Sequence, residues 1–133
     1  LIDVTFANNL AIGSEITASS TFNKKLNAQN LIDQASNTFW AAKKNSKTAE
    51  ISIKQKESTT VNYLELQEYL SLGQRIKAFS IEVKQNGIWN KIAEETTVGH
   101  KRILKLNAAE VSEIRIKILD SKDTPILSEI KIY

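Results

Sequence analysis

Hydrophobic and polar residues alternate along most of this chain from residue 49 onwards. The hydrophobic members of the five clearest runs are Ile51 and Ile53; Leu64 and Leu66; Phe79, Ile81 and Val83; Ile114, Ile116 and Ile118; and Ile130 and Ile132. Because successive side chains of a strand point to opposite faces, this pattern predicts strands with one face in a core and one in solvent. Many short strands without a long helix indicate an all-β fold, an antiparallel β-sandwich or jelly roll.

The dipeptide Asn86-Gly87 lies between two alternating runs and predicts a β-hairpin. A two-residue type I′ turn requires positive φ at both central positions, which favours this pair of residues. The cross-strand pairs expected from this turn are Gln85–Ile88, Lys84–Trp89, Glu82–Lys91 and Ile81–Ile92. In this register the hydrophobic face consists of Ile81, Val83, Ile88 and Ile92. The other face would carry a Glu–Lys pair and a lysine over an indole ring.

The remaining elements are less regular. The hydrophobic positions change phase between Ala78 and Phe79, which predicts a β-bulge there. A short strand is expected at 17–20, followed by a polar loop at 21–27 and a single helical turn at 28–33. Residues 1–8 are interpreted as a linker or an edge strand, and residues 9–133 as one domain.

Composition narrows the class of protein. The 133 residues contain no cysteine, which excludes disulfides and thiolate chemistry. The net charge of +3 comes from scattered lysines rather than a basic stripe interleaved with aromatic residues, so nucleic-acid binding is not expected. No hydrophobic run is long enough to cross a bilayer, and no signal peptide is recognised at the start of the sequence. We interpret the chain as a domain of a longer protein.

The sequence offers little for catalysis. No pair of carboxylates stands in a recognisable strand-end or loop arrangement, as glycoside hydrolysis would need. The single histidine, His100, accompanies no nucleophile-elbow motif, and four glycines form no phosphate-binding loop. The chain is therefore predicted to be non-catalytic.

Several segments resemble a known family in order and spacing. Residues 9–11 (NLA) and 17–20 (TASS) resemble the opening of discoidin-type domains, which are also called coagulation-factor C-type domains and overlap with family 32 carbohydrate-binding modules. Residues 28–33 and 38–40 resemble the next block of that family, and residues 127–130 its terminal strand. The resemblance implies a galactose-binding-domain-like β-sandwich.

The middle of the chain resembles a narrower group. Residues 66–79 and 97–103 are similar to the β-sandwich domain appended to family 29 α-L-fucosidases. The resemblance implies an accessory domain of a bacterial α-L-fucosidase, in a periplasmic, secreted or cell-surface location. Its expected partners are galactose- or fucose-terminated glycans and the catalytic domain of the parent chain. The sequence departs from the family pattern at Gln34, where a glycine is usual, and in the basic segment 43–48.

The resemblance also implies a structural Ca²⁺ ion between the early loop and the last strand. The residues that carry this expectation are Asp33, Thr38 and Glu129 through side chains, and Ala28 and Ser36 through backbone carbonyls. Calcium takes six to eight oxygen ligands, many of them carbonyls, so a few carboxylates suffice. The alternative is that Asp33 caps the following turn and Glu129 pairs with a lysine.

By the same resemblance a sugar would bind at loops 21–27, 68–75 and 99–102. The candidate side chains are Arg75, Glu68, Tyr69, Gln74, His100, Lys101 and Phe22. A guanidinium group can bridge two vicinal hydroxyls, and an aromatic face stacks on the C–H side of a sugar ring. Two alternatives stay open, namely that Arg75 pairs with Glu68 across the loop base and that Tyr69 packs in the core.

Two other functions remain possible for these loops. They could face the catalytic domain of the parent enzyme, or the domain could serve adhesion by binding protein or phospholipid. Membrane insertion is not expected, because the loops are rich in Asn, Lys and Gln rather than in apolar tips.

Overall fold

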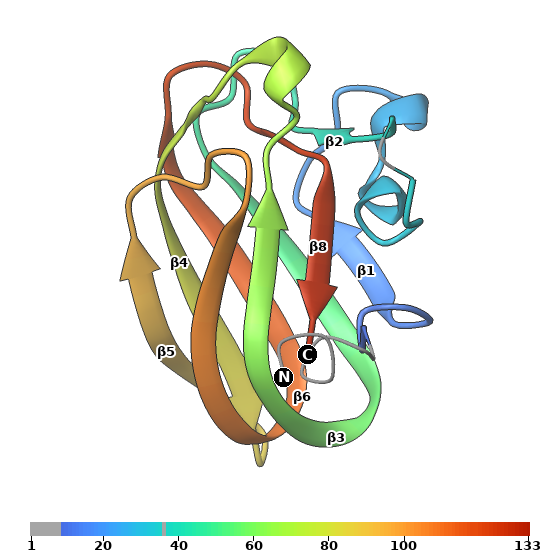
Figure 1. Ribbon diagram of the computed structural model, residues 1–133, viewed down its shortest axis with the longest axis vertical. Helices are drawn as coiled ribbons and strands as arrows, with labels where there is room; N and C mark the ends of the chain where they lie inside the picture. Colours follow the sequence, from blue (N-terminus) through green and yellow to red (C-terminus); the bar gives the residue numbers. More distant parts are fainter. Residues whose placement is uncertain (1–8, 36) are drawn as a thin grey trace.

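Two long antiparallel strands, β3 (Ala49–Gln67) and β6 (Arg102–Ser121), run through the whole structure (Figure 1). The computed structural model describes residues 9–35 and 37–133. The two strands pair twice, with Ile51 opposite Ile116 in one stretch and Leu64 opposite Leu104 in the other. Between these stretches the register shifts, because bulges bend both strands. The same pair of strands therefore contributes to both layers of a β-sandwich.

Shorter strands complete the two layers. The strands and 3₁₀ turns are β1 (Glu15–Ala18), η1 (Lys24–Leu26), η2 (Ala28–Leu31), β2 (Trp40–Ala41), η3 (Leu70–Leu72), β4 (Ile76–Gln85), β5 (Ile88–Glu95), β7 (Ile126–Leu127) and β8 (Glu129–Ile132). The larger sheet has the order β1-β3-β6-β4-β5, while β8 pairs with the second half of β3 and β2 pairs with β7. All of these pairings are antiparallel, which confirms the predicted fold class.

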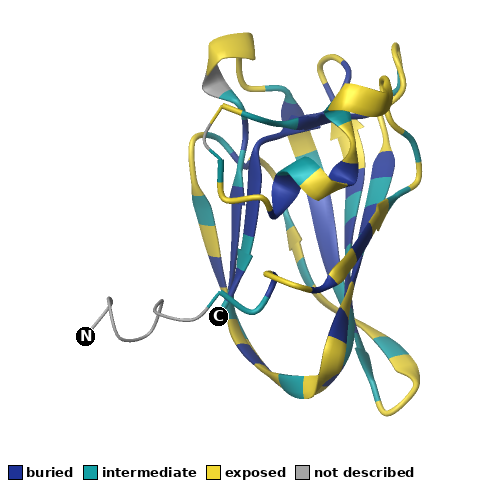
Figure 2. Ribbon diagram, turned by 90° about the vertical axis from the view of Figure 1, so that its right-hand side faces the viewer, coloured by how far each residue is buried: buried dark blue, intermediate teal, exposed yellow. Residues whose placement is uncertain are grey.

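The core lies between the layers, and the alternation predicted it well. The hydrophobic residues of all five runs are at most 2% exposed. Figure 2 shows buried and exposed positions alternating along the strands. Trp40 is also fully buried, and its indole N–H donates to the carbonyl of Ser20 at 3.1 Å. One exception is Glu65, which lies on the polar side of its run but is only 5% exposed.

The predicted hairpin between β4 and β5 is present, but its register is only partly as expected. Asn86 and Gly87 both have positive φ, and the pairs Gln85–Ile88, Lys84–Trp89 and Glu82–Lys91 are observed. The expected Ile81–Ile92 pair is wrong, because a register shift places Ala93 opposite Ile81. Ile92, at this shift, is 37% exposed, and Ile88, which is paired as expected but lies beside the turn, is 64% exposed, so neither belongs to the core.

The outer face of this hairpin also differs from the prediction. Lys91 bonds Glu94 at 2.5 Å rather than Glu82, whose carboxylate accepts from Arg115 Nε at 2.7 Å. Burial raises the pKa of the Glu82 carboxyl, but the hydrogen bond and charge of Arg115 outweigh this and hold the pKa below its ordinary value. The expected lysine over the indole is confirmed, with Lys84 Nζ 6.0 Å from the Trp89 ring centre, but Arg115 is closer at 3.9 Å.

The predicted bulge, early strand and helical turn are all present. Shifts in the β4–β6 register on both sides of Ala78 confirm the bulge near Ala78 and Phe79. The helical turn appears as η2, and the early strand begins two residues sooner than expected. Asparagine side chains cap both early turns: Asn23 Oδ1 accepts from Lys25 N and Leu26 N, and Asn27 Oδ1 accepts from Gln29 N. Residues 1–8, interpreted from the sequence as a linker or an edge strand, lie outside the described residues.

The beginning and end of the described chain lie side by side. The Leu10 N–H donates to the Ile132 carbonyl at 2.7 Å, and the Ile132 N–H donates to Asn9 Oδ1 at 3.0 Å. Asn9 also accepts from the Ala11 N–H, so its amide oxygen joins the two ends. Residues 9–11, part of the family-like opening, therefore close the sandwich at its edge.

Candidate functional site

Glu68 fixes the loop that follows β3. Its carboxylate Oε1 accepts from the backbone N–H groups of Arg75 and Ile76, both at 2.8 Å, and Oε2 accepts from the Gly99 N–H at 2.8 Å. The side chain is only 3% exposed. Hydrogen bonds to a charged acceptor are stronger than neutral ones. Glu68 therefore joins two loops from inside, and its oxygens do not face solvent.

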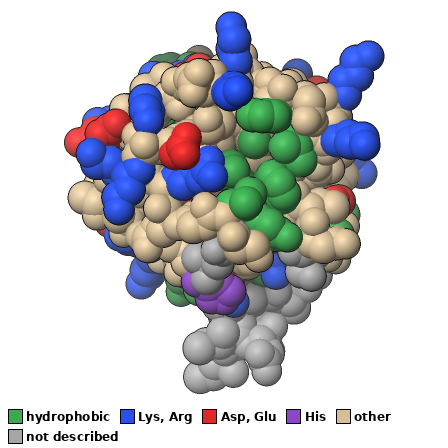
Figure 3. Space-filling view, turned by 90° about the horizontal axis from the view of Figure 1, so that it is seen from above, with side chains coloured by type: hydrophobic (Ala, Val, Ile, Leu, Met, Phe, Trp, Pro, Cys, Tyr) green, Lys and Arg blue, Asp and Glu red, His purple; other side chains and the backbone are tan. Residues whose placement is uncertain are grey.

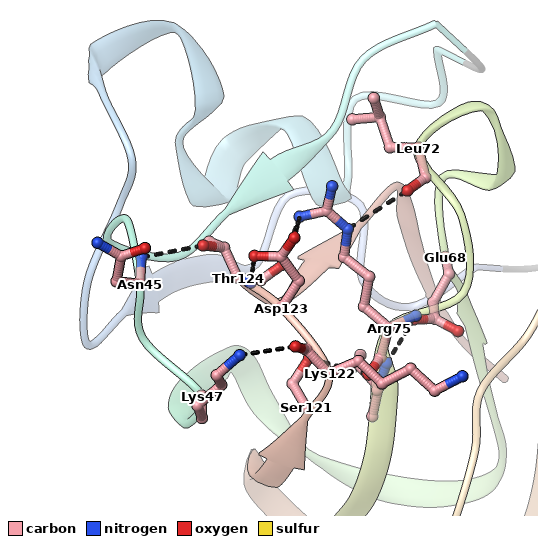
Figure 4. Close-up of polar contacts among 10 residues, drawn as sticks. Asn45, Lys47, Glu68, Leu72, Arg75, Ser121, Lys122, Asp123 and Thr124 are labelled. Atoms are coloured by element: carbon pink, nitrogen blue, oxygen red, sulfur yellow. Dashed lines mark hydrogen bonds and ion pairs between the residues drawn. The ribbon is translucent and has the colours of Figure 1, made fainter.

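Arg75 is held at the end of the sandwich by neighbouring loops (Figure 4). Its Nη1 donates to the Thr124 carbonyl at 3.0 Å, and its Nε donates to the Leu72 carbonyl at 3.3 Å. The carboxylate of Asp123 lies 3.9 Å from Nη1. The guanidinium is thus paired with Asp123 and two carbonyls. The alternative prediction, that Arg75 pairs with Glu68 across the loop base, is wrong for the side chains. Its orientation is fixed before any ligand arrives, which lowers the entropic cost of binding.

Residues 43–47 are attached to the segment that holds Arg75. The Asn45 N–H donates to Thr124 Oγ1 at 3.1 Å, and Lys47 Nζ donates to the Lys122 carbonyl at 2.6 Å. A hydrogen bond from the Thr124 N–H and then the charge of Arg75 lower the pKa of Asp123, so this exposed carboxylate stays ionised. These contacts join the 43–47 and 121–125 segments, which are far apart in the sequence.

Together these segments border an open groove of about 310 Å³. Its lining residues are Phe22, Leu26, Phe39, Ala41, Lys44, Asn45, Leu72, Arg75, Asp123, Thr124 and Ile126. Seen from above, hydrophobic side chains form a patch with basic side chains around it (Figure 3). Phe22 and Leu72 are 47% and 42% exposed, whereas Ala41 and Ile126 are buried and form the floor. The groove thus combines an apolar surface with a fixed guanidinium and a carboxylate.

The structure brings together some of the predicted sugar-site residues. Phe22 and Arg75 both line the groove, from two of the three expected loops. Tyr69 instead stacks on Phe39, with ring centres 4.7 Å apart, behind the groove wall. Glu68 is buried, as described, and Gln74 is exposed but does not line the groove.

The third expected loop lies outside this groove. His100 and Lys101 are exposed, and neither is among the lining residues. Lys101 Nζ is 4.0 Å from Glu65. In place of this loop, sequence reasoning missed Lys44, Asn45, Asp123 and Thr124. The available signals were the basic segment 43–48 and the only proline, Pro125, which marks a turn between strands.

The residues expected to bind calcium also partly converge. Thr38 Oγ1 donates to Asp33 Oδ2 at 2.7 Å, and Asp33 Oδ1 accepts from the Ala35 N–H at 2.9 Å. Ala28 is buried on η2, while Ser36 lies outside the described residues. Gln34 has φ of 62°, so it adopts the left-handed conformation that a glycine would take more easily.

Glu129 faces this loop from β8 and has an unusual environment. It is 6% exposed, and its Oε2 has no hydrogen-bond partner among the described residues. Burial, opposed by Lys131 and reinforced by the charges of Asp33 and Glu65, raises the pKa of the Glu129 carboxyl to about 7. A buried carboxylate oxygen without a donor, close enough to Asp33 to sense its charge, suits a cation. No group of three or more His, Cys, Asp or Glu side chains suited to a metal occurs within residues 9–35 and 37–133, so other oxygens would have to complete the ligand set.

Comparison with known proteins relates this architecture to a family and to particular enzymes. The family model for the F5/8 type C domain matches residues 15–130. Alpha-L-fucosidase 1 of Arabidopsis thaliana is 28% identical over 96% of this chain, which covers 26% of the plant protein. The chain thus spans about a quarter of the length of the curated relatives it matches.

Solved structures give a consistent result. A GH29 fucosidase from Ruminococcus gnavus, solved in complex with fucose, is 29% identical with a TM-score of 0.89, over 99% of this chain and 28% of the enzyme. The family 32 carbohydrate-binding module of Clostridium perfringens NanJ, solved with galactose, shares the fold with a TM-score of 0.80 at 18% identity, over 92% of this chain and 95% of the module. No helix in the described part of the chain is long and apolar enough to span a membrane.

Proposed function

Because this chain belongs to the F5/8 type C (discoidin) domain family, we propose that it is a non-catalytic accessory domain that binds carbohydrate through the groove at the end of the sandwich. The observation that supports this most directly is that Phe22 and Arg75 come from separate loops and line one groove. An aromatic face beside a fixed planar donor group is the usual requirement for holding a sugar ring. The relatives are α-L-fucosidases, and the module that shares the fold was solved with galactose, so fucose- or galactose-terminated glycans are the proposed ligands.

Arg75 and Phe22 would divide the work of recognition. Two of the guanidinium N–H groups are engaged with carbonyls, which leaves others for sugar hydroxyls. The exposed Phe22 ring would stack on the apolar face of the sugar, and Asp123 would accept from a hydroxyl. Glu68, being buried, would act only through the position of the Arg75 backbone.

The test is to titrate the chain with methyl α-L-fucoside and with methyl β-D-galactoside, and to measure each affinity by NMR or calorimetry. Phe22→Ala is expected to weaken binding by a factor of about 2 to 13, because a stacked ring contributes about 0.5–1.5 kcal/mol. Ile103→Ala is the matched control, since Ile103 is similarly exposed at 44% but does not line the groove. Saturable binding that is unaffected by Phe22→Ala would place the sugar elsewhere.

A second role, packing on the catalytic domain of a parent fucosidase, is supported by a different observation. The relatives are about four times longer than this chain, and two large hydrophobic side chains, Phe22 and Leu72, are exposed at the same end. If this role holds, neither glycoside binds at millimolar concentration. Phe22→Ala would then lower the melting temperature of the whole enzyme but not of the isolated domain. With either role, the proposed location is periplasmic, secreted or at the cell surface.

A structural Ca²⁺ ion is also proposed, held by Asp33, Glu129 and Thr38 with the carbonyls of Ala28 and Ser36. The unpartnered Glu129 oxygen and its raised pKa support it, because a bound cation would replace the missing donor. Such an ion would connect η2 and the following loop to β8. Calcium at 100 times its dissociation constant should stabilise the fold by about 2.7 kcal/mol. An equal melting temperature in millimolar Ca²⁺ and in EDTA would exclude the ion.

A further inference from the structure

The basic side chains of this protein divide into those with and those without an ionic partner. Of the 18 Lys and Arg residues, nine lie within 4.0 Å of a carboxylate. The other nine have no such partner among the described residues, which include every Lys and Arg of the sequence. These nine are Lys24, Lys25, Lys43, Lys44, Lys47, Lys54, Lys56, Lys105 and Lys122.

Six of the nine unpaired lysines lie in the segments that build the groove. Lys44 lines it, Lys43 and Lys47 flank that position, and Lys24 and Lys25 immediately precede the lining residue Leu26 in η1. Lys122 precedes Asp123 and hydrogen-bonds to Lys47 through its carbonyl. Figure 3 shows basic side chains projecting around the hydrophobic patch. The strands that carry the sheet, by contrast, pair most of their cations.

Negative charge at the groove does not balance these lysines. Among the described residues that line it, Asp123 is the one acidic side chain, and it is already paired with Arg75. The charged lining residues Lys44, Arg75 and Asp123 thus sum to a net charge of +1, and the other five unpaired lysines add exposed positive charge on the flanking segments. Like charges on neighbouring loops repel, so this arrangement costs stability unless a ligand neutralises it.

From this asymmetry we infer that the groove binds a glycan carrying anionic groups, either sulfate esters or carboxylates, rather than an uncharged sugar. The inference rests on the proposed function and specifies its ligand. The apolar floor, with Phe22 and Leu72 at its edges, would hold the C–H face of a sugar ring, and the lysines around it would contact the substituents. Lysine suits this task because its charge is compact and its stem flexible.

The hollow shape favours a glycan over an anionic membrane surface. Membrane insertion requires apolar side chains that project beyond the surrounding polar groups. Here Phe22 and Leu72 are 47% and 42% exposed at the edges, but Ala41 and Ile126, which form the floor between them, are 1% and 6% exposed, so this apolar surface is recessed. A groove of about 310 Å³ with a recessed apolar floor suits a sugar residue.

The experiment compares a sulfated fucan with the same polymer after chemical desulfation, measured by calorimetry or affinity electrophoresis on the 133-residue chain. Polygalacturonate is the carboxylate probe. We expect the sulfated form to bind at least tenfold more tightly than the desulfated form. Raising NaCl from 0.1 M to 1 M shortens the screening length from about 10 Å to about 3 Å. The sulfated polymer and any bound polygalacturonate should therefore lose about tenfold in affinity, whereas the desulfated polymer should not.

Two matched variants locate the effect. Lys24→Gln/Lys43→Gln/Lys44→Gln removes three unpaired lysines at the groove, and each exposed ionic contact changes affinity by a factor of about 1.5 to 5. The triple variant is therefore expected to bind the sulfated polymer about tenfold more weakly. The control, Lys54→Gln/Lys56→Gln/Lys105→Gln, removes the same charge from the three unpaired lysines on β3 and β6 and is expected to bind as the parent does.

Each other outcome has a definite meaning. Equal affinity for sulfated and desulfated polymers overturns this inference but leaves carbohydrate binding intact. Equal losses in the two triple variants also overturn it, because binding would then follow net charge rather than the groove. Binding of phosphatidylserine vesicles in preference to every glycan would overturn it in favour of a membrane. Failure to bind any glycan overturns the proposed function itself.

Discussion

Replacing Glu68 by alanine should destabilise this domain more than its position at the end of a strand suggests. The change leaves three backbone N–H groups, those of Arg75, Ile76 and Gly99, without their acceptor. A hydrogen bond to a charged group contributes about 1.5–3 kcal/mol, and an unsatisfied buried donor costs about 1–3 kcal/mol. Since water can reach the two partly buried donors, we expect a loss of about 3–5 kcal/mol in the free energy of unfolding.

Urea denaturation at pH 7 measures this loss, and the melting temperature should fall by roughly 10–20 °C for a domain of this size. Glu57→Ala is the control, because Glu57 is exposed on β3 and its side chain makes no hydrogen bond or ion pair with any described residue. It should change stability by less than about 0.5 kcal/mol. A Glu68→Ala variant within 1 kcal/mol of the parent would refute the reasoning, since the carboxylate would then not hold the two loops together.

Three other substitutions test separate features. In EDTA, the free energy of unfolding should fall by about 3 kcal/mol between pH 4.5 and pH 7, because the folded protein keeps the proton on Glu129 that the unfolded chain has lost. Urea titrations at several pH values measure this dependence, and Glu129→Gln should remove it. Gln34→Gly should stabilise the fold by up to about 1 kcal/mol, because residue 34 has a φ of 62°, which glycine adopts without strain. The control, Gln29→Gly in η2, should destabilise it. Unchanged or lower stability for Gln34→Gly would argue against backbone strain at this position. Trp89→Leu should cost about 1 kcal/mol by removing the ring on which Arg115 stacks at 3.9 Å, and a neutral result would show that this half-buried contact contributes nothing.

Much of the fold could be predicted from the sequence because alternation is a local property. The runs around Ile51, Leu64, Phe79 and Ile116 each define a core face without reference to any other strand. The failures arise where a non-local contact decides. The register shift that separates Ile92 from Ile81 comes from a bulge in β5, and no residue type in that strand marks it.

The candidate site was harder to predict for the same reason. Motif resemblance directed attention to the Glu68–Arg75 loop, but it could not show that Glu68 points inward to three backbone donors. Nor could it show that Asn45 bonds to Thr124, 79 positions away, so that the segments carrying Lys44 and Thr124 line one groove with Arg75 only after folding. The basic segment near Lys44 could be recognised in the sequence, but only the structure shows that it lies beside the groove.

The contact between Asn9 and Ile132 has a consequence for how such a domain can be arranged in a larger protein. Because residues 9 and 132 are hydrogen-bonded neighbours, the described part of the chain begins and ends at nearly the same point. Figure 1 places the C-terminus towards the end of the sandwich opposite the loops that form the groove. The order of domains along a chain could therefore be exchanged, or the unit inserted within a loop, and the groove would still face away from the attachment point.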